Sequence, residues 1–97
     1  MFMGFVNQGS DFTAVFPVTG LYQQPITATV SYKVYGPLGD LMANSSGTAT
    51  QILVGIYKAV IPVKTVNQYE AGKFYNLVVT YPVGNDTKMQ FFTFGAV

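Results

Sequence analysis

The chain has no cysteine, histidine, tryptophan or arginine, and few of its residues carry a charge. Without cysteine a disulfide scaffold is excluded, and without cysteine and histidine the usual zinc ligand sets are missing. The same absences remove the commonest general base and the thiol nucleophile from catalysis. We therefore expect no metal, no cofactor and no enzymatic activity.

Charge of either sign is scarce. Charged residues make up 9% of the chain, against about 25% in an ordinary domain. All five cations are dispersed lysines, and the formal net charge is +1. Nucleic-acid-binding proteins concentrate positive charge to neutralise phosphates, so we expect no nucleic-acid partner. Three of the four carboxylates, Asp11, Asp40 and Glu70, lie beside serine, glycine or alanine, and Asp86 lies between Asn85 and Thr87. All four are expected in turns, where a structural role explains them.

Long hydrophobic runs are also missing. Residues 1–6 are apolar, but they are too few to span a bilayer, and they have neither a basic flank nor a small-residue cleavage site. We therefore expect no signal peptide, no transmembrane segment and no membrane partner, and a protein that folds in the cytoplasm.

Apolar and aromatic residues are plentiful: 49% of the 97 residues are hydrophobic and 15% are aromatic. A chain of this length buries about 64% of its surface on folding, which supports one modest core. With so little charge to keep copies apart, the composition is typical of a subunit in an assembly. The alternative is a monomer whose aromatic side chains all fit in its own core.

The hydrophobic pattern has the period of β-strands. In residues 27–35 the side chains of Ala28, Val30, Tyr32 and Val34 alternate with polar ones, as a half-buried antiparallel strand requires. Further strands are predicted at 12–16, 41–43, 48–53, 55–61, 74–81 and 88–94, with turns at 36–40, 44–47 and 84–86 and room for one helical turn within 63–70. Pro17, Pro62 and Pro82 are expected to end their strands.

A glycine turn precedes the strand that begins near residue 74. Tyr75 shares a face with Leu77 and Val79, and it is the candidate for the tyrosine whose hydroxyl bonds back to nearby backbone at the corner of immunoglobulin-like sandwiches. The alternative is an ordinary aromatic residue of the core. We predict an all-β protein, an immunoglobulin-like antiparallel β-sandwich of about seven short strands. Residues 1–10 would form an apolar N-terminal arm, and residues 11–97 a single β-sandwich domain. A small closed barrel is the alternative architecture.

The last predicted hairpin carries large apolar side chains on both faces, and only one face can line the chain's own core. The other face is expected to be covered by another subunit or partner, or by the N-terminal arm folding back; the arm could also add to a neighbour's sheet edge. The predicted interface comprises Phe2, Phe5, Val6, Phe74, Val78, Met89 and Phe91.

Carbohydrate binding is a second hypothesis. Small β-sandwiches bind sugars through exposed aromatic rings flanked by amides, and the residues for such a site would be Tyr22, Tyr35, Tyr81 and Asn85, helped by Gln23 and Gln24. The absence of tryptophan weakens this hypothesis. A third hypothesis is an adhesion subunit that polymerises into chains. We expect no export signal, and its absence argues against this hypothesis.

The order of segments 11–16, 28–39, 55–61 and 69–75, followed by a final aromatic strand, resembles the small immunoglobulin-like domains of tailed-bacteriophage virion proteins. These include capsid cement (decoration) proteins, head fibres and baseplate adaptors. The resemblance implies a non-enzymatic structural protein located in the virion. We expect a cement subunit that bridges capsid proteins, with the major capsid protein or another virion protein as partner, and a homo-oligomeric state, a dimer or trimer. A tail or baseplate adaptor domain is the alternative within this class.

Overall fold

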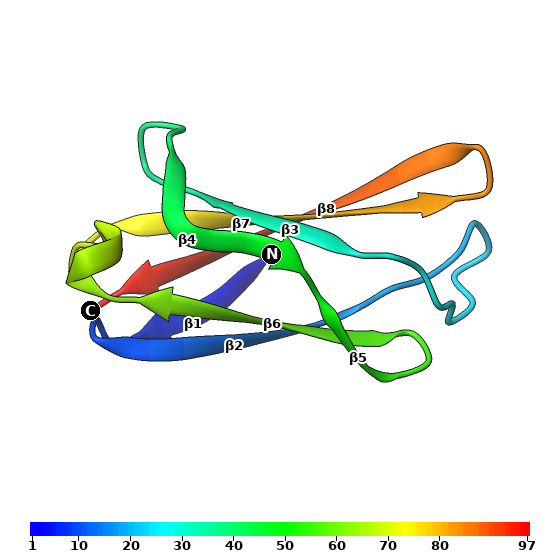
Figure 1. The fold of residues 1–97 in the computed structure, drawn as a ribbon, viewed down its shortest axis with the longest axis horizontal. Coiled ribbons are helices and arrows are strands. Elements are labelled where there is room, and N and C mark those ends of the chain that lie inside the picture. Colours follow the sequence, from blue (N-terminus) through cyan, green and yellow to red (C-terminus); the bar gives the residue numbers. More distant parts are fainter.

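The computed structural model describes residues 1–97 throughout, and the chain forms two β-sheets that pack face to face (Figure 1). The five-stranded sheet has the order β1-β8-β7-β3-β4, and the three-stranded sheet has the order β2-β6-β5. One short 3₁₀ helix, η1 (Thr65–Asn67), precedes β7. The strands are β1 (Phe2–Val6), β2 (Ser10–Pro17), β3 (Ser31–Tyr35), β4 (Leu41–Thr48), β5 (Thr50–Leu53), β6 (Ile56–Val63), β7 (Phe74–Val83) and β8 (Asp86–Ala96).

The core lies between the sheets and is built by alternation along each strand. Inward side chains of β6 and β7 are buried while their outward neighbours are wholly or partly exposed, as the period of two demands. The largest fully buried side chains include Tyr69, Tyr75, Tyr81, Phe16 and Phe94. The all-β prediction is confirmed, and the two separate sheets favour the sandwich over a closed barrel.

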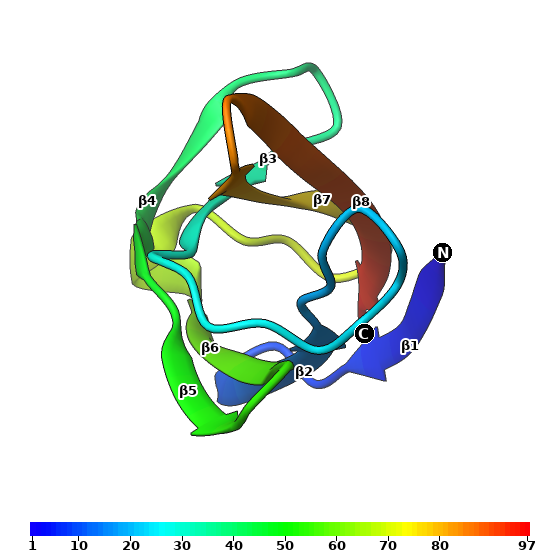
Figure 2. The same ribbon diagram turned by 90° about the vertical axis from the view of Figure 1, so that its right-hand side faces the viewer.

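The N-terminal residues belong to the sheet. β1 pairs in parallel with β8, from Phe2 opposite Thr93 to Val6 opposite Ala96. Figure 2 shows this strand at the edge beside β8. The segment therefore takes the folded-back arrangement within its own chain, and it supplies the eighth strand that the sequence pattern did not predict.

The β7–β8 hairpin confirms the prediction made from residues 84–86. Ten register pairs run from Phe74 opposite Gly95 to Val83 opposite Asp86. Gly84 has φ 61° at the turn, a conformation that glycine adopts without a Cβ penalty and that matches the twist of two-residue hairpins.

Three predictions of strand limits are wrong. β3 begins at Ser31 rather than Thr27, although the buried face of this stretch is right, since Val30 and Val34 are fully buried. Strands continue through Pro62 and Pro82. Pro62 pairs only with β2, because it lies past the end of the pairing between β5 and β6. Pro82 likewise pairs only with β8, because it lies past the end of the pairing between β3 and β7. On the side without a neighbouring strand, the missing proline N–H costs no ladder hydrogen bond.

The polar run at residues 44–47 does not form the predicted turn and lies inside β4. The register jumps from Lys33 opposite Ser46 to Tyr35 opposite Leu41, which leaves an unpaired bulge on β4. Asn44 in this bulge adopts φ 54°, which asparagine tolerates better than most residues. Bulges bend strands, and Figure 1 shows β4 bending toward the second sheet, which the chain then joins as β5.

Candidate functional site

The outward face of the five-stranded sheet carries the most concentrated exposed apolar surface. Register pairing aligns Phe5, Gly95 and Phe74 in one row across β1, β8 and β7, and Phe91 with Val78 in a second row. Met89 lies opposite Thr80 in a third row. We call this side of the sheet the outer face, and the outer apolar patch is Phe2, Phe5, Phe74, Val78, Met89 and Phe91.

Three phenylalanines form one cluster at one end of the outer face. The ring centroids of Phe2 and Phe5 are 5.2 Å apart at 70°, and those of Phe5 and Phe74 are 6.3 Å apart. The rings of Phe5 and Phe74 lie over Gly95, where an added Cβ would stand 2.8 Å from Phe5 Cδ1 and 3.2 Å from Phe74 Cε1. Gly95 therefore gives the rings room to approach the backbone. A glycine inside a strand is the sequence signal for such an approach.

The side chains of the patch are exposed despite this packing. Phe5 is 65% exposed and Phe91 is 61% exposed, while Phe2, Phe74 and Met89 each retain about half of their surface. Val78 is half-buried between its neighbours. Val6 is different, because it is partly buried and packs against the core. It therefore lies apart from the outer apolar patch, although the predicted interface included it.

The outer side of the other sheet is less continuous. Val15 pairs with Lys58 and Val60 pairs with Thr13, so polar and charged side chains interrupt its exposed apolar residues. Leu53 is exposed at the edge, on β5. The outer face of the five-stranded sheet is therefore the better candidate for a protein contact.

A shallow hollow on the outer face overlaps the outer apolar patch, because Val78 and Met89 line it. Its volume is about 330 Å³. Lys33 and Tyr35 of β3 contribute its polar side, and neither was among the predicted interface residues. The lining residues are Ser31, Tyr32, Lys33, Tyr35, Val78, Thr80 and Met89.

The four residues predicted to contact sugar do not form one site. Tyr81 is 1% exposed, and its hydroxyl donates to Thr19 O and accepts from Thr19 N, so the prediction that it contacts a sugar is wrong. Tyr35 lies on the outer face at the start of the β3–β4 loop, while Asn85 lies in the β7–β8 turn at the opposite end of the molecule (Figure 1). Tyr22 is exposed in the loop that precedes β3.

The carboxylates are separated, and two of them pair with lysines. Asp11 Oδ1 is 3.5 Å from Lys64 Nζ, and Glu70 Oε2 is 2.9 Å from Lys73 Nζ. The hydrogen bond that Lys73 Nζ donates to the Glu70 carboxylate raises the pKa of Lys73. Nowhere do three or more His, Cys, Asp or Glu side chains lie together so that they could hold a metal ion.

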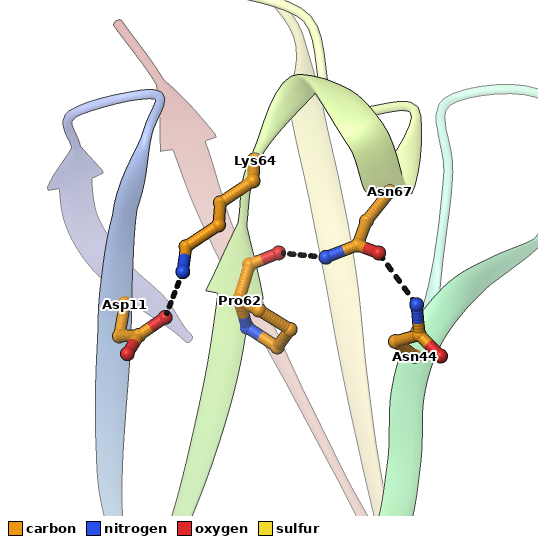
Figure 3. A network of polar contacts seen from close by, with 5 residues as sticks. All are labelled: Asp11, Asn44, Pro62, Lys64 and Asn67. Atoms are coloured by element: carbon orange, nitrogen blue, oxygen red, sulfur yellow. Dashed lines mark hydrogen bonds and ion pairs between the residues drawn. The ribbon is translucent and has the colours of Figure 1, made fainter.

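A polar network joins β4 to the 3₁₀ turn. Asn44 Nδ2 donates to Asn67 Oδ1 at 2.7 Å, and Asn67 Nδ2 donates to Pro62 O at 3.0 Å (Figure 3). Asn67 is 3% exposed. The sequence indicated only that one helical turn fits within residues 63–70, and it did not reveal that this side chain is buried. The network fixes the β4 bulge against the end of β6.

Two tyrosine hydroxyls complete this corner. Ser45 Oγ and the Tyr69 hydroxyl are 2.6 Å apart, and burial raises the pKa of Tyr69 to about 12 although the Ser45 hydrogen bond opposes the shift. The Tyr75 hydroxyl accepts from Glu70 N at 2.7 Å. The expected bond from Tyr75 back to nearby backbone is therefore confirmed.

Comparison of the chain with known protein families, characterised proteins and solved structures gave no match. The structure has no helix with the length and apolar character needed to cross a bilayer.

Proposed function

We propose that the protein is a non-enzymatic structural subunit of a tailed-bacteriophage virion, a capsid cement protein that works by protein–protein contact. The observation that carries the proposal is the outer apolar patch, in which five large side chains stay half or more exposed. If each such side chain has about 200 Å² of surface when fully exposed, the five exposed fractions together amount to about 500 Å² of apolar surface. This approaches the upper end of the largest patches seen on monomers, which reach about 600 Å².

The immunoglobulin-like part of the proposal is supported by the order of the strands. If β2 to β8 are lettered B, C, C′, D, E, F and G, the sheets become C′CFG and BED. These are the neighbours found in immunoglobulin sandwiches with a C′ strand. The bond from Glu70 N to the Tyr75 hydroxyl occupies the place of the tyrosine corner at the start of strand F.

The energy of such a contact suits a lattice protein. Burying about 500 Å² of apolar surface supplies roughly 12 kcal/mol of gross driving force, most of which association and ordering costs offset. One contact is then modest, while repeated contacts on a symmetric shell become firm together.

The test is rebinding to particles that lack the protein. Purified wild-type chain, the Phe91→Ser variant and a Leu53→Ser control are mixed with stripped particles, and bound protein and resistance to osmotic shock are measured. Leu53 is as exposed as the patch residues but lies on the other sheet. We expect the wild-type chain and the control to rebind and protect, and Phe91→Ser to lose at least tenfold in affinity. Failure of the wild-type chain to rebind would overturn the proposal.

A further inference from the structure

The outer face carries a projection and a hollow side by side. The projection, which we call the knob, is the cluster of Phe2, Phe5 and Phe74. The hollow is the one of about 330 Å³ that Val78, Thr80 and Met89 line together with side chains of β3. Along β7, six residues separate Phe74 from Thr80, which corresponds to about 20 Å. Between the Phe74 row and the Thr80 row lie the row of Asn76 and Thr93 and the row of Val78 and Phe91, and Val78 already borders the hollow.

We propose that the partner on the outer face is a second copy of this chain, docked so that the knob of each copy fills the hollow of the other. This inference rests on the proposed function and specifies the homo-oligomeric contact within it: the outer face joins two copies into the unit that binds the shell. A two-fold axis that lies in the interface and crosses the strands between the row of Asn76 and Thr93 and the row of Val78 and Phe91 exchanges the two ends of the face. Such an interface is isologous, because both copies use the same surface and the contact between one copy's knob and the other copy's hollow occurs twice.

The size of the hollow suits aromatic rings. A cavity of about 150 Å³ accommodates one benzene molecule, so about 330 Å³ has room for two of the three knob rings. One side of a standard interface covers about 800 Å², of which about 500 Å² is apolar. The exposed part of the outer apolar patch is of that size, so one face supplies what a stable dimer requires.

The charge on the outer face also suits a second copy. Lys33 is the only charged residue among those that register pairing places on this face in β1, β8, β7 and β3. It lines the hollow, where its ammonium group would meet the ring faces of the partner's knob, an attraction of the cation–π kind. Because each Lys33 faces the other copy's knob, the two lysines stay apart.

The experiment is sedimentation velocity over a range from low micromolar to millimolar protein. We expect the wild-type chain to dimerise reversibly, and Phe5→Lys in the knob and Met89→Glu in the hollow each to weaken dimerisation at least tenfold. The control Leu53→Ser should dimerise like the wild-type chain. Because all three substituted side chains are half or more exposed, urea unfolding midpoints close to wild type verify that the variants fold.

Mixing the two charged variants distinguishes the proposed docking from other dimers. In a mixed dimer one knob meets one hollow unaltered, and the second contact brings the new lysine to the new glutamate. We expect the equimolar mixture to recover dimers that neither variant forms alone. A wild-type chain that stays monomeric, variants that dimerise normally, or a mixture that recovers nothing overturns the inference. A monomeric chain that still rebinds particles leaves the proposed function standing, whereas a dimer that never binds particles removes that function alone.

Discussion

At the scale of single residues, hydroxyl and amide groups hold the corner where β4, η1 and β7 meet. Tyr75 and Tyr69 are both essentially buried, and each hydroxyl has a partner at 2.7 Å or less. No buried side-chain nitrogen or oxygen lacks a hydrogen bond. Since an unpaired buried polar group is costly, these residues should be sensitive to conservative changes that remove one oxygen.

Replacing Tyr75 with Phe removes the acceptor for the Glu70 N–H and leaves the ring in place. We expect Tyr75→Phe to lower the free energy of unfolding by about 1 kcal/mol, the usual worth of such a bond, as measured by urea denaturation. Tyr22→Phe is the matched control, because Tyr22 is 88% exposed and its hydroxyl makes no hydrogen bond within the chain. Equal stability of Tyr75→Phe and wild type would show that this bond does not stabilise the corner.

Tyr69 makes stability depend on pH in the alkaline range. Burial raises its pKa in the folded state from 10.0 to about 12, so the folded chain keeps a proton that the unfolded chain loses. Stability is therefore fully present below pH 10 and falls as the pH rises from 10 toward 12. We expect unfolding midpoints to decrease over this range and to decrease less steeply in Tyr69→Phe. Parallel curves for the two proteins would contradict this assignment.

At the scale of elements, the strands follow from alternation but their ends do not. The hairpin of β7 and β8 and the single helical turn were predictable, because glycine at a tight turn and period-two patterns are local signals. The bulge in β4 was not, since a run of Asn and Ser is typical of a turn. Its side chains instead bond to Asn67 and Tyr69, which lie more than twenty residues further along the chain.

Asn67 should therefore matter more than its position in a short loop suggests. Asn67→Ala removes both amide bonds and leaves Asn44 Nδ2 and Pro62 O without their partner. We expect a loss of about 2 kcal/mol in the free energy of unfolding, about 1 kcal/mol for each of the two hydrogen bonds, measured by urea denaturation. Val66→Ala, next in sequence and 81% exposed, should change it by less than about 0.5 kcal/mol. Comparable losses in both variants would contradict the role of the network.

At the scale of the whole molecule, composition predicted an excess of apolar side chains over what one small core encloses, and the structure leaves Phe2, Phe74, Met89 and Phe91 half or more exposed. Alternation identified most of the outer apolar patch, because both faces of the last hairpin are apolar. The packing of Val6 against the core and the hollow that Lys33 lines were not predicted, since they depend on how β1 and β3 pair within the sheet. Local sequence patterns do not specify the order of the strands in the sheet.

The most direct test of the central claim is hydroxyl-radical footprinting of the outer apolar patch in the free and assembled protein. Tyr22, exposed in a loop, and Tyr75, buried in the core, serve as the reactive and unreactive references within the same chain. We expect Phe91 and Met89 to be oxidised readily at low concentration and to become at least fivefold protected in the dimer or on the particle, while Tyr22 stays reactive. Unchanged oxidation of Phe91 and Met89 in every assembled state would contradict the claim that protein covers this face.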